Sequence, residues 1–356
     1  MTPDEFRQAN PSLYFLHTGE VAGLAAYLRG LQVLDVAEEI LQVTKAGEGN
    51  MNCVVRVTTD RRSFIVKQSR PWVEKYPQFE APWDRACREI EFYELVRSFP
   101  AVARYLPDLI RGDPKSRVLV LEDLGTGGDY TGVYQGLRLG TVEMDCCAEF
   151  LTSLHALFVK DASRPALPNR EMRALNHRHI FVLPLTRDNG LDLESIQAGL
   201  TAPAEALRGD DAYRAEVMRL GSEVYLAEGP CLLHGDFFPG SFVRTAAGPR
   251  VIDPEFCFFG APEYDVGILL GHLFLSGQPA ELRQRFRDAY RAENVFDDLL
   301  MLQLAGVEIM RRILGYAQLP MLGDLAWKAR LLDLSRELVL HPRTVLLTAD
   351  VPLPNS

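Results

Sequence analysis

The strongest constraint on the fold lies between residues 231 and 260, where two short apolar runs each lead into acidic residues. CLL is followed by HGDFFPGS with Asp236, and RVI is followed by DPEF with Asp253 and Glu255. Apolar runs of this length bounded by Gly and Pro predict short buried strands. One such acid alone is well explained by a turn cap or an arginine partner. Three acids at the ends of two strands favour a strand–loop–strand unit that carries a polar site.

The length of the chain requires more than one core. At 356 residues it exceeds the size at which a single core usually stops growing, so we predict two lobes. The Gly-rich stretch GTGGDYTG offers a boundary, with an N-terminal lobe over 1–124 and a C-terminal lobe over 125–356. Strand patterns dominate the first lobe and helical periodicity the second. We therefore expect an α+β fold with a small antiparallel sheet in one lobe.

Local patterns predict the elements of the first lobe. In chain order these are one or two short helices over 19–42, a strand–turn–strand over 43–59, a strand over 61–69, a packed loop over 71–83, a helix that follows an Asp84 N-cap and runs through Val96, and a strand over 117–125. In the second lobe, 160–222 shows weak helices and loops in no clear order, and 264–347 is rich in helical periods.

Composition narrows the class of protein. A net charge of -10 argues against a nucleic-acid partner, because such partners bind through Lys and Arg. The sequence has no apolar run of about 20 residues, which argues against a membrane partner. The N-terminus does not resemble a signal peptide, and the six cysteines form no CxxC pair, so we expect a cytoplasmic protein with reduced thiols. A small-molecule substrate fits this composition best.

The turn KAGEGNMN carries the small residues that let a backbone approach a phosphate, namely Gly47, Gly49 and Asn50. An ordinary hairpin explains the same turn equally well. Lys67, in the apolar run SFIVKQS, needs an anionic partner if it is buried. Either it snorkels from an edge strand or it pairs with Glu89 or Glu91 on the following helix, of which we favour Glu89. Kinases use such a pair to present an ammonium group to the α and β phosphates of a nucleotide.

The three acids of the opening stretch then acquire chemical roles. Asp236 has the setting of a carboxylate that accepts a hydrogen bond from a substrate hydroxyl and orients it for attack. Asp253 and Glu255 supply hard oxygen donors that suit Mg²⁺ bridging the terminal phosphates of ATP.

In order and wording, these motifs resemble the phosphotransferases of protein-kinase-like fold, the group that contains aminoglycoside phosphotransferases, choline kinases and methylthioribose kinases. The narrower resemblance, from about Val43 to Ala317, is to the methylthioribose kinases. Its carriers are GEGNMN, IVKQSRPWVEKY with DRA at 84–86, HGDFFPGS with VIDPEF, and MRRILGYA. The resemblance implies a bilobal fold and transfer of the γ-phosphoryl group of ATP, with Mg²⁺, to the anomeric hydroxyl of 5-methylthioribose.

Position by position, the resemblance implies a role for each site residue. Nucleotide contacts would come from Gly47, Gly49, Asn50, Lys67 with Glu89 or Glu91, the backbone of Glu122 and Leu124 at the adenine edge, and Ser241. Asp236 would be the catalytic base, Asp253 and Glu255 the metal ligands, and Arg311 with Arg312 the binders of the sugar or the transferred phosphoryl group. Asp265 would brace the catalytic loop. From the residues alone, a structural ion pair explains the two arginines almost as well.

Two departures from the family concern the acceptor. Phe237 and Phe238 stand where the family tends to have Leu and His, and the chain is short between His155 and Cys231. We therefore keep two rivals, a kinase of another sugar, amino alcohol or aminoglycoside, and an inactive nucleotide-binding module. Family habit also allows a homodimer.

Overall fold

The structure is a computed structural model that describes residues 3–47, 51–160, 164–291 and 296–347. The chain divides into two compact units. The first comprises Met1–Gly128 and Arg250–Glu255, and the second Asp129–Pro249 and Phe256–Ser356. The first break lies close to the expected boundary at 124. The return of Arg250–Glu255 to the first unit differs from a division into two continuous lobes, and this segment carries two of the predicted site residues.

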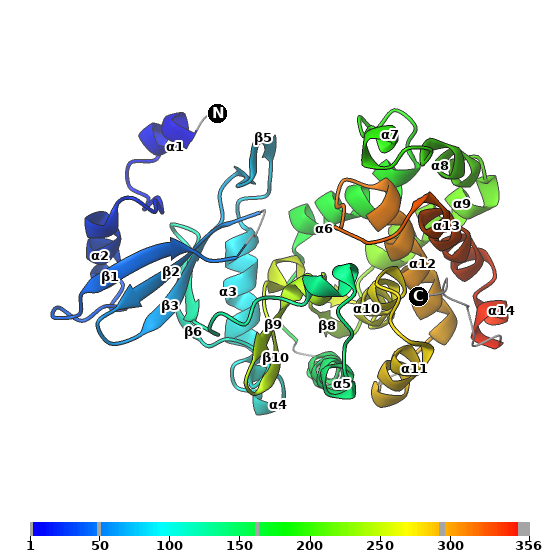
Figure 1. Ribbon diagram of the computed structural model, residues 1–356. Helices are drawn as coiled ribbons and strands as arrows, with labels where there is room; N and C mark the ends of the chain where they lie inside the picture. Colours follow the sequence, from blue (N-terminus) through cyan, green and yellow to red (C-terminus); the bar gives the residue numbers. More distant parts are fainter. Residues whose placement is uncertain (1–2, 48–50, 161–163, 292–295, 348–356) are drawn as a thin grey trace. The chain divides into compact units, whose positions relative to one another are not determined.

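The first unit is built on a five-stranded antiparallel sheet in the order β1-β2-β3-β7-β6 (Figure 1). Its strands are β1 (Ile40–Lys45), β2 (Cys53–Thr59), β3 (Ser63–Gln68), β6 (Leu109–Asp113) and β7 (Val118–Glu122), and a separate hairpin pairs β4 (Trp72–Val73) with β5 (Tyr76–Glu80). Its helices are α1 (Pro3–Ala9), α2 (Val21–Gly30), α3 (Arg85–Val96) and α4 (Pro100–Ala103).

The two faces of this sheet have different partners. One face, with Val55 and Val66, joins a core with Leu24 and Leu28 of α2. Because side chains alternate along a strand, Lys67 points to the opposite face. There α3 packs against β6 and β7. Thus β3 and α3 position the two members of the predicted ion pair.

Three local predictions for the first unit are corrected. Of the one or two short helices expected over 19–42 with a break near Gly30, α2 ends at Gly30 as expected, but residues 40–42 belong to β1 (Ile40–Lys45). The chain turns between them, with Gln32 at a positive φ of 60°. The expected packed loop contains the β4–β5 hairpin. Asp84 stands at the N-cap of α3 but makes no capping bond, because its carboxylate pairs with Arg117 at 2.7 Å.

The second unit is mainly helical. Its α-helices are α5 (Thr141–Ala156), α6 (Arg170–His177), α7 (Leu193–Ile196), α8 (Thr201–Arg208), α9 (Asp211–Arg219), α10 (Glu263–Leu275), α11 (Ala280–Ala289), α12 (Asp298–Leu314), α13 (Leu325–Leu340) and α14 (Pro342–Leu347). Two π-helical segments, η2 (Arg178–Val182) and η4 (Leu220–Tyr225), lie in the region that the sequence left unordered. The shorter elements are η1 (Thr131–Gln135), η3 (Leu183–Leu185), β8 (Cys231–Leu233), η5 (Pro239–Ser241), β9 (Phe242–Thr245), β10 (Gly248–Val251), η6 (Pro254–Phe256) and β11 (Phe258–Gly260), of which β10 and η6 cross the unit boundaries.

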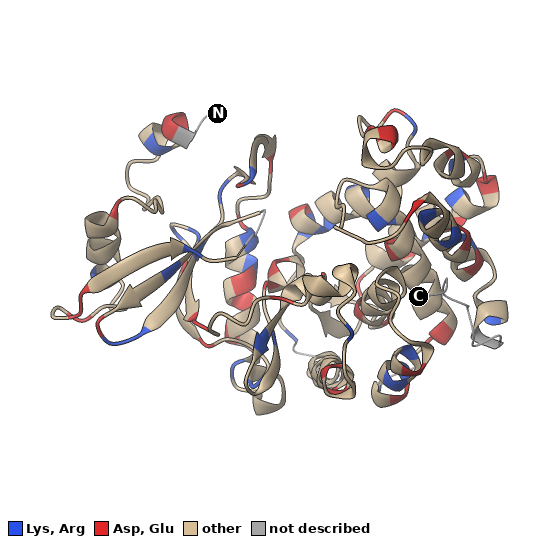
Figure 2. Cartoon of the chain, in the orientation of Figure 1, with Lys and Arg blue, Asp and Glu red and all other residues tan. Residues whose placement is uncertain are grey.

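Helices α10, α12 and α13 form the centre of this unit, and every residue of α10 is buried. Close packing depends on glycine. A Cβ on Gly267 would lie 2.7 Å from the Met301 carbonyl oxygen of α12, and one on Gly306 would lie 2.9 Å from the Ser335 carbonyl oxygen of α13. Both basic and acidic side chains lie on α11 and α13 (Figure 2). Among the described residues, no helix has the length and apolar character needed to cross a bilayer.

Candidate active site

Lys67 is held between two carboxylates of the first unit. Its Nζ lies 2.7 Å from Oε2 of Glu89 and 2.6 Å from Oδ1 of Asp253. Lys67 and Glu89 are buried, whereas the Asp253 side chain is 48% exposed. Burial lowers the pKa of Lys67, but the charges of Asp253 and then Glu89 outweigh it and hold this pKa above its ordinary value. The ammonium group is therefore charged and fixed.

The sequence left two candidate partners for Lys67, and the structure pairs it with Glu89. Glu91, one of the two candidate partners, pairs instead with Arg88 at 2.6 Å on the outer side of α3, so a pairing with Lys67 is excluded. The reason is helical geometry, since residues two apart on a helix point about 200° from each other. Burial raises the pKa of Glu89 to about 7, against the lowering effect of Lys67.

Asp253 and Glu255 are fixed by different means. Asp253 has a left-handed backbone with φ of 61°, a conformation that Asp adopts more readily than most residues. Glu255 is buried, and its Oε2 accepts a hydrogen bond from Asn52 at 2.8 Å and lies 3.5 Å from Nε of Arg85. Arg85 is fully buried and also donates to main-chain oxygens at Arg70, Pro82, Met51 and Trp72. The bond to Asn52 thus attaches Glu255 to the end of the turn KAGEGNMN.

The donors around Asp253 and Glu255 fit Mg²⁺. No group of three or more His, Cys, Asp or Glu side chains with metal-binding geometry occurs in the part of the chain that the structure describes. Mg²⁺ does not need one, because it is commonly held by one or two carboxylates together with water and substrate phosphates. The exposed Asp253 and the oriented Glu255 match that pattern.

The remaining predicted nucleotide contacts lie at the turn and at the end of β7. Gly47 has a positive φ of 71° and open space around its Cα, while Gly49 and Asn50 lie outside the described residues. Glu122 ends β7, where its amide donates to Asp108 and its carboxylate accepts from Arg250 at 3.1 Å. Leu124, two residues further on, is half-buried. The contacts of Glu122 and Leu124 with adenine stay predictions.

The loop that carries Asp236 is braced from α10. Both carboxylate oxygens of Asp265 accept main-chain N–H groups, from His234 at 2.7 Å and from Gly235 at 3.0 Å. Gly235 has φ of +85°, and a Cβ there would lie 2.2 Å from the Phe256 carbonyl oxygen. Ser241 is buried, and its hydroxyl donates to the main-chain oxygen of Asp236 at 2.8 Å. This bond holds the Ser241 side chain against the loop, and its contact with the nucleotide stays a prediction.

Two arginines of α12 approach Asp236. Nη2 of Arg311 lies 3.3 Å from Oδ1 of Asp236, and Nη2 of Arg312 lies 3.6 Å from the same atom. Both guanidinium groups are buried and both contact Glu308, at 2.6 Å and 2.7 Å. The Asp236 side chain itself is 23% exposed. The arginines thus form structural ion pairs and also lie against the predicted catalytic base, while their binding of the sugar or the transferred phosphoryl group stays a prediction.

The two phenylalanines that depart from the family pattern differ in kind. Phe237 is fully buried, stacks on Phe150 at 5.5 Å between ring centroids, and packs against Phe242. It is a core residue, and a contact of its ring with the acceptor stays a prediction. Phe238 is half-buried and lies under the guanidinium of Arg312, with 4.6 Å between that group and the ring centroid. It therefore packs against the arginine cluster, which consists of Arg311, Arg312 and Glu308.

Some site residues were not found from the sequence. Asn52 orients Glu255, and Glu308 joins the two arginines. The signal for Glu308 was present, because residues three and four apart share a helix face and Glu308 precedes Arg311 and Arg312 by those spacings. His155 is buried and bonded to Asp265 at 3.3 Å, as expected for a core histidine.

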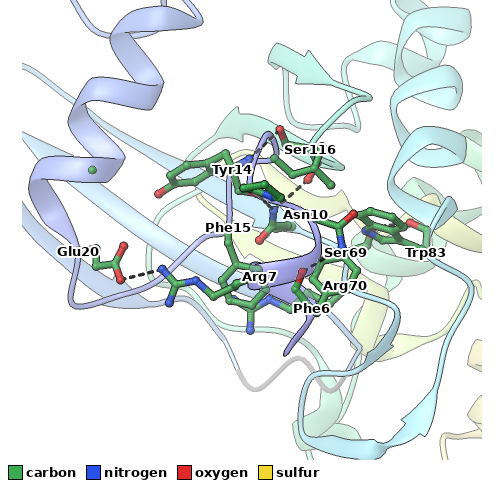
Figure 3. A pocket seen from close by; sticks show the side chains of 14 residues that line it. Phe6, Arg7, Asn10, Tyr14, Phe15, Glu20, Ser69, Arg70, Trp83 and Ser116 are labelled. Atoms are coloured by element: carbon green, nitrogen blue, oxygen red, sulfur yellow. Dashed lines mark hydrogen bonds and ion pairs between the residues drawn. The ribbon is translucent and has the colours of Figure 1, made fainter. Parts of the chain in front are cut away.

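A cavity of about 360 Å³ lies elsewhere in the first unit, between the N-terminal segment and the end of β3 (Figure 3). Gln68, Ser69 and Ser116 line it. The Gln68 amide bonds to main-chain groups, and Ser69 donates to the Trp83 carbonyl. Because Gln68 and Lys67 point to opposite sheet faces, this cavity is separate from the Lys67 cluster.

Comparison with known proteins agrees with this geometry. The sequence profile of the phosphotransferase enzyme family matches residues 42–300. The methylthioribose kinase of Exiguobacterium sibiricum is 25% identical over 79% of this chain and 82% of its own, and that of Klebsiella pneumoniae subsp. pneumoniae is 28% identical over 79% and 72%. The structure of the gentamicin–APH(2″)-IIa complex is similar with a TM-score of 0.53 at 14% identity, covering 92% of this chain and 97% of that one. The predicted α+β fold of the protein-kinase-like class is thereby confirmed.

Proposed function

This chain belongs to the phosphotransferase enzyme family, and from that premise we propose that it transfers the γ-phosphoryl group of ATP to the anomeric hydroxyl of 5-methylthioribose. The observation that carries the proposal is the pair of guanidinium groups beside Asp236, at 3.3 Å and 3.6 Å. The named relatives support the acceptor.

The chemistry is alignment and charge compensation. Lys67, fixed by Glu89, would hold the α and β phosphates. Asp236 would accept the hydrogen bond of the sugar hydroxyl and orient its oxygen for attack, and Arg311 or Arg312 would stabilise charge on the transferred group. Asp253 and Glu255 would hold Mg²⁺, which neutralises phosphate charge when bound. Lys67 then has to exchange its contact with Asp253 for a phosphate, while its contact with Glu89 persists.

The charges around Asp236 favour a neutral acceptor. A choline or aminoglycoside cation that approached Asp236 would also meet two guanidinium groups, and like charges at such distances repel. A sugar hydroxyl meets no such barrier. We accordingly rank choline and aminoglycosides below a sugar, and among sugars the named relatives favour methylthioribose. A cytoplasmic location and a homodimer stay predictions.

The test is ADP release with Mg²⁺ and ATP, comparing methylthioribose, ribose, choline and kanamycin. Asp236→Asn serves as the blank. We expect turnover with methylthioribose that the blank loses. Turnover with choline or kanamycin alone would refute the acceptor, and tight ATP binding without any ADP release would support the inactive nucleotide-binding module instead.

A further inference from the structure

Glu308 lies at the centre of the arginine cluster, although none of the sequence motifs includes it. It stands on α12 one turn before the two arginines, and its side chain is fully buried. Its Oε2 accepts from Nε of Arg311 at 2.6 Å, and its Oε1 accepts from Nε of Arg312 at 2.7 Å. Each carboxylate oxygen therefore holds one guanidinium group.

The atoms used in these bonds determine where the arginines point. Glu308 binds the Nε edge of each guanidinium, and Nη2 of each extends to Oδ1 of Asp236. A guanidinium is planar and rigid, so fixing one edge fixes the direction of the other. The Nη2 groups of Arg311 and Arg312 are consequently both directed at Oδ1 of the predicted base.

A second layer holds Glu308 itself. Nε2 of His272 lies 2.8 Å from Oε1 of Glu308, and Nδ1 of His272 lies at hydrogen-bond distance from the Tyr134 hydroxyl. His272 is buried on α10, and burial lowers its pKa to about 4. The ring is therefore neutral near pH 7 and donates from Nε2 to Glu308. The carboxylate keeps its charge because the arginines outweigh the effect of burial and hold its pKa well below its usual range.

The charges of the cluster balance only when Glu308 is ionised. Two guanidinium cations then face two carboxylates, Glu308 and Asp236. Without the charge of Glu308, both cations would depend on Asp236. They would then be drawn closer to Asp236 than the 3.3 Å and 3.6 Å of the structure, and their direction would no longer be fixed.

We propose that Glu308 is a positioning residue for phosphoryl transfer, which holds the Nε edges of Arg311 and Arg312 and so fixes the direction of both guanidinium groups beside Asp236. The proposal rests on the proposed function, because it assigns a role within the same site. Glu308 acts through the arginines and does not itself touch substrate.

The first experiment compares Glu308→Gln with the unchanged enzyme in ADP release. The glutamine amide has only one oxygen that can accept a hydrogen bond. Its NH₂ group faces the Nε–H of the other arginine, donor against donor, so one arginine loses its hydrogen bond to residue 308. A displacement of about 1 Å in such a site can lower a rate by about 10²-fold. We expect kcat to fall by about that factor while KM for ATP stays unchanged. An unchanged kcat overturns the proposal.

Glu216→Gln is the matched control. Glu216 pairs with Arg219 at 2.7 Å with the same three-residue spacing, but it also accepts a hydrogen bond from Gln303 and lies apart from the arginine cluster. The kcat of this variant should equal that of the unchanged enzyme. If Glu308→Gln fails to fold, Glu308→Asp replaces it, because it keeps the charge and withdraws the carboxylate by one methylene. A normal kcat in Glu308→Asp would then overturn the proposal.

A double-mutant cycle separates positioning from a general structural role. In an Arg311→Ala background only Arg312 has to be held, and the one oxygen of the glutamine amide can accept its hydrogen bond. Glu308→Gln should therefore lower kcat much less in this background than it does in the unchanged enzyme. An equal factor in both backgrounds would show that Glu308 does not act through Arg311.

One readout does not depend on any acceptor. Phenylglyoxal reacts with accessible guanidinium groups, and peptide mass spectrometry locates the product. Labelling at Arg311 and Arg312 should be faster in Glu308→Gln than in the unchanged protein, and unaffected in Glu216→Gln. If no acceptor is turned over, the proposed function fails while labelling still tests the role of Glu308. Equal labelling rates in all three proteins overturn it.

Discussion

Lys67 shows how a single charged side chain can be made compatible with burial. Its ammonium group lies within 2.7 Å of two carboxylates, one buried and one exposed. The buried partner fixes the position, and under the proposed function the exposed partner would be exchanged for a phosphate. This arrangement gives the two carboxylates different purposes although they contact the same atom.

Replacing Lys67 by methionine should abolish most phosphoryl transfer. The variant keeps the length of the side chain but removes the charge offered to the phosphates, and loss of one preorganised electrostatic contact lowers kcat by about 10²–10³-fold. ADP release at saturating acceptor measures the effect. Lys75→Met, at an exposed position between β4 and β5, is the control and should retain full activity. Equal kcat values in the two variants would remove Lys67 from the nucleotide site.

Gly235 is a position where backbone geometry excludes a side chain. With φ of +85° and the Phe256 carbonyl 2.2 Å from any added Cβ, Gly235→Ala should destabilise the protein by about 3 kcal/mol. Gly30→Ala is the comparison, since nothing lies within 4 Å of its Cβ position. Thermal unfolding should show a lower Tm for Gly235→Ala and no loss for Gly30→Ala. A Tm for Gly235→Ala equal to that of the unchanged protein would contradict the described loop geometry.

Among the elements, α10 contributes a buried histidine that makes stability depend on pH. His272 has a pKa of about 4 in the folded protein, below its ordinary value of 6.5, because burial disfavours the charged ring. The unfolded chain therefore binds a proton first as pH falls. The contribution of His272 to stability is complete above pH 6.5 and is lost progressively from pH 6.5 to pH 4, by about 3 kcal/mol.

The measurement is the free energy of unfolding of the unchanged protein minus that of His272→Gln, followed from about pH 7.5 to pH 4, a range that spans both pKa values. Taking the difference cancels the titration of groups that both proteins share. The difference should shrink as pH falls below 6.5. A difference that is constant over this range would mean that His272 titrates alike in the folded and unfolded states.

For the molecule as a whole, the return of Arg250–Glu255 means that the first unit is not one continuous segment. Arg250 contacts Glu122, the Val251 amide donates to Tyr105, and Asp253 contacts Lys67. A fragment of residues 1–128 lacks all of these contacts. It also lacks the Glu255 carboxylate beside the buried Arg85.

We expect the 1–128 fragment to unfold at a lower temperature than the same fragment joined to residues 250–255 by a flexible linker. Removing one member of a buried ion pair typically destabilises a protein by about 3–5 kcal/mol, which is a large part of the stability of a small domain. Circular dichroism during heating measures the effect. The control is the same fragment joined to a segment with the residues of 250–255 in scrambled order. Identical Tm values for the fragment, the joined fragment and the control would contradict the assignment of Arg250–Glu255 to the first unit.

The sequence predicted the Lys67–Glu89 ion pair but misplaced some of the elements. Lys67 and Glu89 could be paired because a buried ammonium needs an anion and helical spacing limits the choice. Residues 40–42, the start of β1, were assigned to a helix because a short apolar run fits both periodicities. The π-helical segments at 178–182 and 220–225 went unrecognised because such turns have no pattern of their own. Glu255 could be chosen as an acid near phosphate, but its bond to Asn52 joins residues 203 positions apart, which no local pattern reveals.

The left-handed backbone of Asp253 has an evolutionary consequence. Asn and Gly are the two residues that tolerate this conformation best, and each is one nucleotide change away from an Asp codon. Either change removes the carboxylate and leaves the loop unstrained. Under the proposed function, in which Asp253 holds Mg²⁺, a lineage released from selection for turnover would lose catalysis in one step without straining this loop. Relatives with Asn or Gly at this position would then mark where the scaffold has been recruited to another task.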